Sequence, residues 1–180
     1  MLTAEPLPPA GLAAARDGVK AYLRLGNDGE DALLAGLVDT ALGVAEAFLG
    51  QATIARGFGE AVTADGRWHK LARSPVRAIT GVSDLARALP VDAYRVDIDA
   101  DSLGWVRVVG VGQAVTVTYR AGLAEAWDAL PAPLAHGVVM LAAHLFDQRG
   151  GDAAPPAAVA ALWRPFRRMT LGAPSWRWVA

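Results

Sequence analysis

The spacing of apolar residues changes twice along the chain. Up to residue 50 they recur every three or four positions, which is the period of one helical face. Over residues 52–120 the period shortens to two, as in a half-buried strand, and after residue 131 the helical period returns. The chain has to bury both kinds of face. We therefore predict an α+β fold that is mainly α, with an antiparallel β segment inserted between two helical halves.

The N-terminal half of the helical pattern predicts two helices. The first covers residues 12–25 and the second residues 28–49, with Val38 and Val44 on the apolar stripe of the second. Gly50 follows directly, at the position where a left-handed C-terminal cap is usual.

Several residues indicate where helices begin and end. Asn27 and Glu30 have the spacing of a capping box and predict the start of the second helix. A third helix should follow Pro131, and a fourth should follow Pro156. Pro165 lies inside the fourth pattern and should kink that helix or end it early. The result is a small bundle of about four helices.

The inserted segment contains short alternating runs at residues 76–82, 94–98, 105–109 and 115–119. Glycines and prolines separate them, which favours turns between strands. We predict a small antiparallel sheet or a set of hairpins that forms a β-hairpin arm. The expected organisation is a single domain over residues 1–180, with helical parts 11–50 and 131–170, a β insertion 52–120 and a C-terminal tail 171–180.

Composition limits the environment of the chain. Its 180 residues are 53% hydrophobic and include no cysteine, so a core can form, but disulfides and thiolate metal sites cannot. The first ten residues lack the basic and apolar regions of a signal peptide. The apolar run over residues 137–146 is far shorter than the roughly 18 residues that cross a bilayer. We expect a soluble, cytoplasmic product with no membrane partner.

Charge is distributed unevenly, although the net charge is only -1. Residues 1–50 contain seven acidic and three basic residues, whereas residues 153–180 contain four arginines and no acid. Such a dipolar subunit can stack head to tail on its neighbours, while a general nucleic-acid binder would have a net basic face. Ordinary scatter of surface charge is the alternative explanation.

Metal-binding motifs are weak in this sequence. His136 and His144 lie eight residues apart on one predicted helix, whereas metal sites usually place histidines three or four apart. Asp97, Asp99 and Asp101 alternate as in a calcium loop, but the following glycine and the closing glutamate are missing. We expect no metal and no cofactor.

Catalytic motifs are also missing from the sequence. It contains no His-Glu-x-x-His, no Walker loop and no Gly-x-Ser-x-Gly elbow. Asp65, His69 and Ser74 have the residue types of a triad, but spacing alone does not identify one. We therefore predict that the protein is not an enzyme and has no catalytic residues.

Aromatic residues and arginines gather at the C-terminal end. These residue types dominate the hot spots of protein interfaces, and two tryptophans in the last five residues would be unfavourable in water. Trp163 and Phe166 alternatively close the core. We predict a docking surface made of Trp163, Arg164, Phe166, Arg167, Arg168, Trp176, Arg177 and Trp178.

Two blocks resemble the head-to-tail connector (adaptor, or head completion) proteins of long-tailed phages and gene transfer agents. The first runs from VKAYLRL at residues 19–25 to AEAFLG at residues 45–50. The second runs from LPAPL at residues 130–134 through AHLFDQR at 143–149 to ALWRPFRR at 161–168. The order and spacing of the blocks are more specific than either block alone. FDQ stands where these proteins often have Tyr-Glu-Asn, and the β segment belongs to their variable part.

The resemblance implies a structural virion protein. Such subunits form a homo-oligomeric ring, commonly of twelve copies, beneath the portal protein and above the stopper or tail-terminator protein. DNA is present only in transit through the lumen. The C-terminal docking surface would then be the portal interface. The protein would be made in the host cytoplasm and located in the neck of a virion or virus-like particle.

Two other functions stay open. The chain could be a stopper or tail-terminator subunit of the same neck, which would contact the tail instead of the portal. It could also be a DNA-packaging or DNA-binding module. Only the last predicted helix carries a basic patch, which disfavours this second alternative, and salt-dependent DNA binding would support it.

Overall fold

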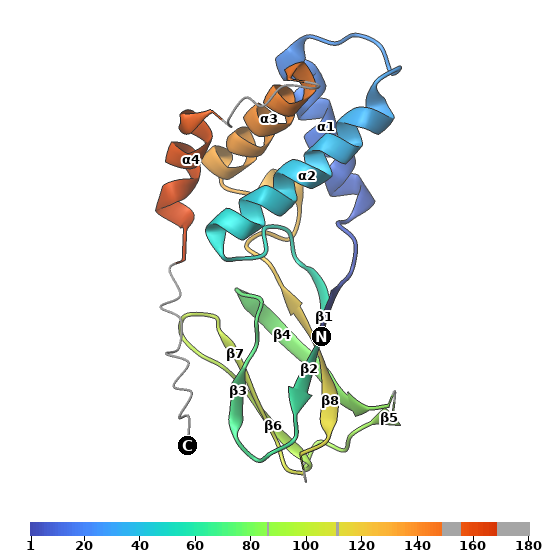
Figure 1. Cartoon of the computed structure of the whole chain (residues 1–180), viewed down its shortest axis with the longest axis vertical. Helices are drawn as coiled ribbons and strands as arrows, with labels where there is room; N and C mark the ends of the chain where they lie inside the picture. The colour runs from blue at the N-terminus through green and yellow to red at the C-terminus, as the bar shows by residue number, and fades with distance from the viewer. Residues whose placement is uncertain (86, 111, 149–155, 169–180) are drawn as a thin grey trace, which may run out of the picture.

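The computed structural model describes residues 1–85, 87–110, 112–148 and 156–168, and it consists of a helical part and a β part stacked end to end (Figure 1). This confirms the α+β class and the bundle of four helices. The helical part contains α1 (Pro9–Leu23), α2 (Asp31–Leu49), α3 (Ala132–Asp147) and α4 (Ala157–Trp163), with short 3₁₀ turns at η1 (Trp127–Ala129) and η2 (Arg164–Phe166).

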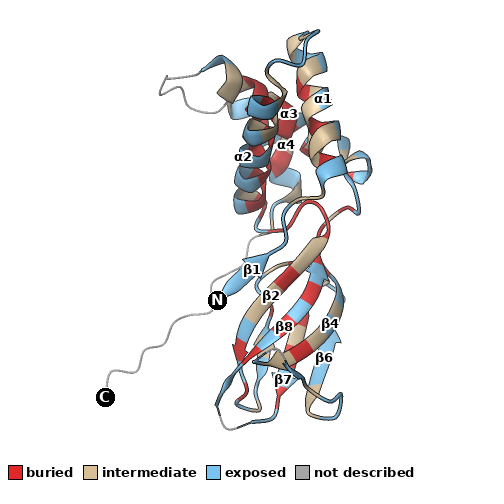
Figure 2. Ribbon diagram, turned by 90° about the vertical axis from the view of Figure 1, so that its right-hand side faces the viewer, coloured by how far each residue is buried: buried red, intermediate tan, exposed pale blue. Residues whose placement is uncertain are grey.

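The β part contains two antiparallel sheets, which makes it more than a hairpin arm. The larger sheet has the order β1-β2-β8-β4-β5 and the smaller has the order β3-β7-β6. Their inner faces share one buried cluster, and Figure 2 shows the alternation of buried and exposed positions along the strands. In chain order the strands are β1 (Leu2–Ala4), β2 (Arg56–Thr63), β3 (Trp68–Lys70), β4 (Val76–Asp84), β5 (Arg87–Ala88), β6 (Tyr94–Ile98), β7 (Gly104–Val108) and β8 (Ala114–Ala121).

The core of the helical part follows the predicted stripes with one exception. Val38 is buried between α2 and its neighbours, as expected. Val44 is 44% exposed, and Leu42 and Leu49 are buried instead. The buried face of α2 is therefore rotated from the predicted stripe, because α1, α3 and α4 all pack on it.

Helix ends were predicted with mixed success. Gly50 has a φ of 68° and caps α2 as expected. The capping-box prediction is wrong: Glu30 is the N-cap without a side-chain cap bond, and Asn27 Oδ1 accepts from Gly29 N at 3.2 Å. Lys20 instead holds the start of α2, since its Nζ lies 2.7 Å from Asp31 Oδ1.

Helix α2 is long and apolar enough to cross a membrane, judged by length and composition alone. The sequence analysis expected no apolar segment long enough to cross a bilayer, and it did not consider α2. Core helices of soluble proteins pass the same test, and one face of α2 packs on α1 and α3. The opposite side of α2 is exposed and includes Asp39.

Two chain segments run side by side at the junction of the two parts. Ile54 and Ala124 form a parallel bridge, and Ala55 N donates to Ala124 O at 2.8 Å. Gly122 permits this approach, because a Cβ there would lie 2.4 Å from the Ala55 backbone nitrogen. Backbone pairing thus ties the exit of α2 to the exit of β8.

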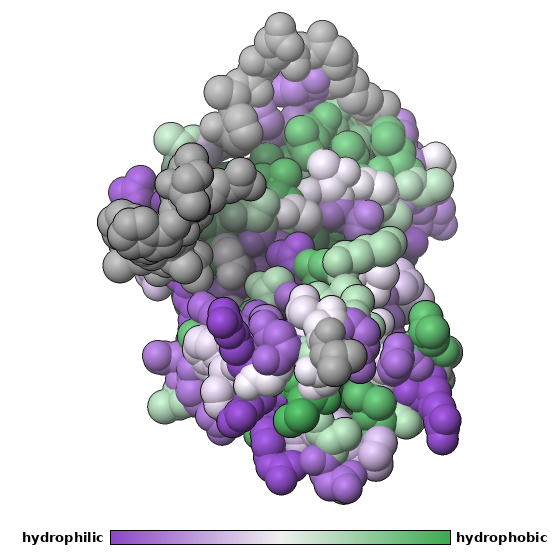
Figure 3. All heavy atoms as spheres, turned by 60° about the horizontal axis from the view of Figure 1, so that its bottom comes forward, coloured by the Kyte–Doolittle hydropathy of each residue, from purple (hydrophilic) through white to green (hydrophobic). Residues whose placement is uncertain are grey.

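Large exposed apolar side chains of the β part include three in its turns. Leu85, Val91 and Val109 are 98%, 79% and 71% exposed. Figure 3 brings this end of the molecule forward and shows apolar residues interspersed with polar ones. Scattered apolar residues of this kind are usual on protein surfaces.

Candidate docking segment and its attachment

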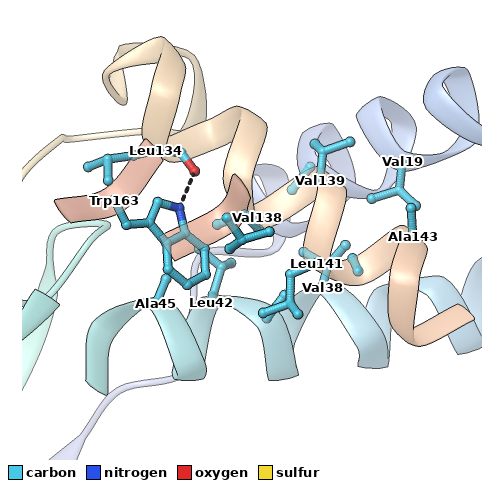
Figure 4. Packing of buried hydrophobic residues seen from close by; sticks show 14 of the residues in the cluster. Val19, Val38, Leu42, Ala45, Leu134, Val138, Val139, Leu141, Ala143 and Trp163 are labelled. Atoms are coloured by element: carbon cyan, nitrogen blue, oxygen red, sulfur yellow. Dashed lines mark hydrogen bonds between the residues drawn. The ribbon is translucent and has the colours of Figure 1, made fainter. Parts of the chain in front are cut away.

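Trp163, the first residue of the predicted docking surface, lies in the core of the helical part. It is 2% exposed, and its ring centroid is 5.9 Å from that of Phe48. Its indole Nε1 donates to the carbonyl oxygen of Leu134 at 3.3 Å (Figure 4). Gly137 provides the space, since a Cβ there would lie 2.2 Å from this nitrogen. Trp163 therefore anchors α4 on α3.

The exposed part of the segment begins directly after Trp163. As predicted, Pro165 ends the α-helix early, and the chain continues as the 3₁₀ turn η2. Arg164 and Arg167 are exposed, while Phe166 is half-buried against the helical core. The Arg167 guanidinium also lies over the Phe48 ring, 5.3 Å from its centroid. Both arginines remain accessible to a partner.

Arg168 connects this segment to the β part. Its backbone N donates to Leu49 O at 2.9 Å, and its guanidinium donates to the carbonyl oxygen of Asp101 between β6 and β7. A cleft of about 610 Å³ opens here, and Lys70 and Arg73 also line it. The segment therefore spans from α2 to the smaller sheet.

Gln51 also binds the segment over residues 164–168. Its Nε2 donates to the carbonyl oxygen of Phe166 at 2.7 Å, and its side chain is buried. Beyond Arg168, the predicted docking residues Trp176, Arg177 and Trp178 lie outside the described residues. The structure thus brings Arg164, Phe166, Arg167 and Arg168 together at the junction and places Trp163 behind them in the core.

The strongest polar site of the junction escaped the sequence analysis. Glu46 on α2 is 6% exposed and forms a two-pronged ion pair with Arg56 at the start of β2. The distances from Oε1 to Arg56 Nη1 and from Oε2 to Arg56 Nη2 are 2.8 and 2.7 Å. Oε1 also accepts from the N and Oγ1 of Thr53, at 2.8 and 3.0 Å. This ion pair therefore connects α2 to the first residue of β2 in the β part.

The protonation of Glu46 reflects two opposing effects. Burial disfavours the charged carboxylate and would raise its pKa. Hydrogen bonds from Arg56 and Thr53, with the positive charge of Arg56, outweigh burial and hold the pKa of Glu46 below its ordinary value. The carboxylate therefore stays ionised at neutral pH.

The other candidates from the sequence have local structural roles. Asp65 Oδ1 lies 2.8 Å from His69 Nε2 and accepts from Arg67 N, so the pair stabilises the turn between β2 and β3. The Asp99 carboxylate accepts from Leu103 N and Trp105 Nε1 within the β6–β7 turn. In the described ranges, no group of three or more His, Asp or Glu side chains is placed to hold a metal ion.

Comparisons with known proteins show which solved chains share these features. No family model matches the sequence, and no curated protein matches it. Solved structures do match. A chain in the neck of an empty GTA particle, computed with C6 symmetry, has 27% identity and a TM-score of 0.77, and the alignment covers 96% of this chain and 98% of that chain.

Two further structures give the same relationship with the same coverage of both chains. A chain of the virion of a native gene transfer agent (GTA) particle has 27% identity and a TM-score of 0.70. A chain of the neck of a native GTA particle, computed with C12 symmetry, has 28% identity and a TM-score of 0.71. The similarity includes both the helical part and the β part. The chain is therefore similar, over nearly its whole length, to chains of the neck and virion of gene transfer agent particles, which supports the neck or connector family that the sequence resemblance indicated.

Proposed function

We propose that this chain is the adaptor subunit of a particle neck. Copies form a ring that docks beneath the portal, links the capsid to the tail and lets DNA pass through its lumen. The observation that carries this proposal is the coverage of the match: 96% of this chain and 98% of a neck chain share one arrangement. A match of this extent is not limited to one motif or to one of the two parts.

The ring itself is supported by the symmetry of the related necks. Similar chains occur in neck structures computed with C6 and with C12 symmetry, and cyclic symmetry places identical contacts around an axis. Twelve copies is the expected number. The test is the native mass of the purified protein, alone and mixed with the portal protein. A single copy per particle, or a position outside the neck, would refute the proposal.

The C-terminal segment is the proposed portal contact. Arg164 and Arg167 face solvent beside the partly buried Phe166, and no acidic residue follows residue 153 to neutralise them. Acidic groups on a portal surface would complement this charge. Trp163 supports the segment from the core, and Trp176 and Trp178 are proposed to add apolar contacts.

Truncation after Leu171 is expected to weaken attachment to portal rings without unfolding the subunit. The buried core residues of the described ranges end at Trp163, so truncation after Leu171 deletes none of them. A tryptophan at an interface hot spot contributes on the order of 2 kcal/mol or more, and each subunit would lose two. Co-sedimentation with portal rings measures the attachment, and thermal melting checks the fold.

Charge reversal gives an independent test with a matched control. Arg164→Glu with Arg167→Glu should reduce portal attachment, whereas Arg87→Glu with Arg107→Glu, which changes two exposed arginines of the β part, should not. Equal attachment of the truncated and full-length chains would exclude the tail as the dock. The β part would then become the better candidate.

The stopper or tail-terminator role is the second candidate for the same neck. Attachment to tail components instead of portal rings would favour it. A DNA-binding function would instead require tight duplex binding that weakens steeply with salt. The basic side chains of Lys70, Arg73 and Arg168 around the junction cleft make this measurement worthwhile.

A further inference from the structure

The junction cleft carries an excess of positive charge, which comes from Lys70, Arg73 and Arg168 in its lining. It has a volume of about 610 Å³ and lies between the end of α2 and the turns that lead into β4 and β7 (Figure 1). Neither Lys70 nor Arg73 forms a side-chain hydrogen bond or ion pair within the described ranges. Cations of this kind in a recess favour a negatively charged ligand.

Two carboxylates also line the cleft, but they do not cancel this charge. Glu46 is already neutralised by its ion pair with Arg56. Asp101 is exposed, and among the described lining residues it is the one other acid beside three cations. Lys70 also interacts at longer range with Asp99, which does not line the cleft. The cleft therefore has a net positive charge, and a ligand with several carboxylates would complement it.

Buried hydrogen bonds hold the cleft wall that carries Lys70 and Arg73. The hydroxyl of Tyr119, a residue that is 1% exposed, accepts from Arg73 N at 3.2 Å and donates to Glu60 Oε2 at 3.0 Å. The same carboxylate oxygen accepts from Ala72 N at 2.8 Å. These bonds fix the backbone of the wall before a ligand arrives, which lowers the entropy cost of binding.

The opposite wall of the cleft is the end of the docking segment. Arg168 N donates to Leu49 O, and the Arg168 guanidinium donates to the carbonyl oxygen of Asp101. The cleft is therefore continuous with the exposed Arg164 and Arg167 of the same segment. A partner chain that contacts these two arginines needs only to extend past Arg168 to enter the cleft.

We infer that the junction cleft binds an acidic, extended segment of the protein that contacts the docking segment, with its carboxylates paired to Lys70, Arg73 and Arg168. The inference rests on the proposed function, under which that protein is the portal protein. A recess of about 610 Å³ can take up a few residues of a protruding chain. Duplex DNA, whose major groove alone is about 12 Å wide, is too broad to enter it.

Charge reversal in the cleft should weaken attachment to portal rings by more than about ten-fold, because like charges would then face the acidic segment. The variant combines Lys70→Glu with Arg73→Glu, and the control combines Arg87→Glu with Arg107→Glu, at two exposed arginines outside the cleft. Attachment equal to that of the wild type, with an unchanged melting temperature, overturns the inference. If this variant attaches normally but loses binding to duplex DNA in a gel-shift assay, the inference is overturned in favour of DNA.

Thiol protection tests the cleft without altering its charge. The chain has no cysteine, so Ala72→Cys introduces a single thiol at an exposed position of the cleft wall. Portal rings, with their own thiols blocked beforehand, should largely abolish its labelling by a fluorescent maleimide, while Leu85→Cys, at a 98% exposed residue, should stay reactive. Labelling of Ala72→Cys that portal rings do not slow overturns the inference, even where the charge-reversal variant fails to fold. If the wild-type chain does not attach to portal rings, the proposed function itself fails.

Discussion

Replacing Glu46 with alanine is expected to lower the free energy of unfolding by about 3–5 kcal/mol. The change leaves the Arg56 guanidinium at the junction without its carboxylate, and the Arg56 side chain is only 11% exposed. It also removes the acceptor for the backbone N and the hydroxyl of Thr53. Unfolding in urea, followed by tryptophan fluorescence and by circular dichroism, measures the loss.

Asp17→Ala provides the matched control for this prediction. Asp17 also pairs with an arginine, Arg16, but its side chain is 62% exposed, and exposed pairs contribute about 0–1 kcal/mol. A second comparison is Glu46→Leu combined with Arg56→Met, which removes both charges and should cost much less than Glu46→Ala alone. If Glu46→Ala is as mild as Asp17→Ala, the buried pair does not hold the junction together.

Stability should also depend on pH through Glu46. Its pKa in the folded state lies below the value of about 4.3 that a glutamate has in an unfolded chain. The stabilisation is therefore complete above that value and is lost as the pH falls through the folded-state pKa. The difference in unfolding free energy between the wild type and Glu46→Gln should stay constant from pH 7 to about pH 5 and shrink below about pH 4. A difference that grows on acidification would show that the pKa is raised.

The helices were predictable because their signal is local. Apolar residues three or four positions apart decide whether a short segment buries one face, and this located all four helices. The rotation of the α2 stripe was not predictable, because large apolar residues lie on both sides of this helix and two of its packing partners, α3 and α4, lie about a hundred residues away. The start of α2 was not predicted correctly because it is stabilised by a contact between two helices, the ion pair of Lys20 on α1 with Asp31.

The arrangement of the strands depends on contacts that no local pattern contains. Alternating residues predicted strands between residues 76 and 119, but β2 pairs with β8, so that Arg56 is opposite Ala121. The division into two sheets follows from such long-range pairs. A small antiparallel sheet or a set of hairpins was therefore the most that periodicity indicated, and it gave no sign of a core shared between two sheets.

Local sequence patterns were also insufficient to predict which residues of the docking segment are buried. Tryptophan and phenylalanine occur both in cores and at interfaces, so the types of Trp163 and Phe166 could not separate the two roles. Gly137, distant in sequence, places Trp163 in the core. The Glu46–Arg56 pair did leave a signal, because Glu46 is an acid on the apolar stripe of α2, between Ala45 and Leu49. A charge at such a position requires a partner.

Trp163→Ala is expected to lower the free energy of unfolding by about 3–5 kcal/mol. The indole fills the space above Gly137, contacts Phe48 and donates a hydrogen bond to Leu134 O, and the variant would replace it with a cavity in the helical core. Because α4 and η2 depend on this anchor, the docking segment should also become easier to cleave. Urea unfolding measures the first effect, and limited proteolysis near Arg164 and Arg167 measures the second.

Two further variants separate anchoring from a general loss of tryptophan. Trp68→Ala removes an indole that is 47% exposed on β3, so its cost should be much smaller than that of Trp163→Ala. Gly137→Ala keeps the indole but places a methyl group 2.2 Å from Trp163 Nε1, which should displace the ring and expose the segment to proteases in the same way. If both Trp163→Ala and Gly137→Ala leave proteolysis at Arg164 and Arg167 unchanged, the segment is held by Gln51 and Arg168 alone.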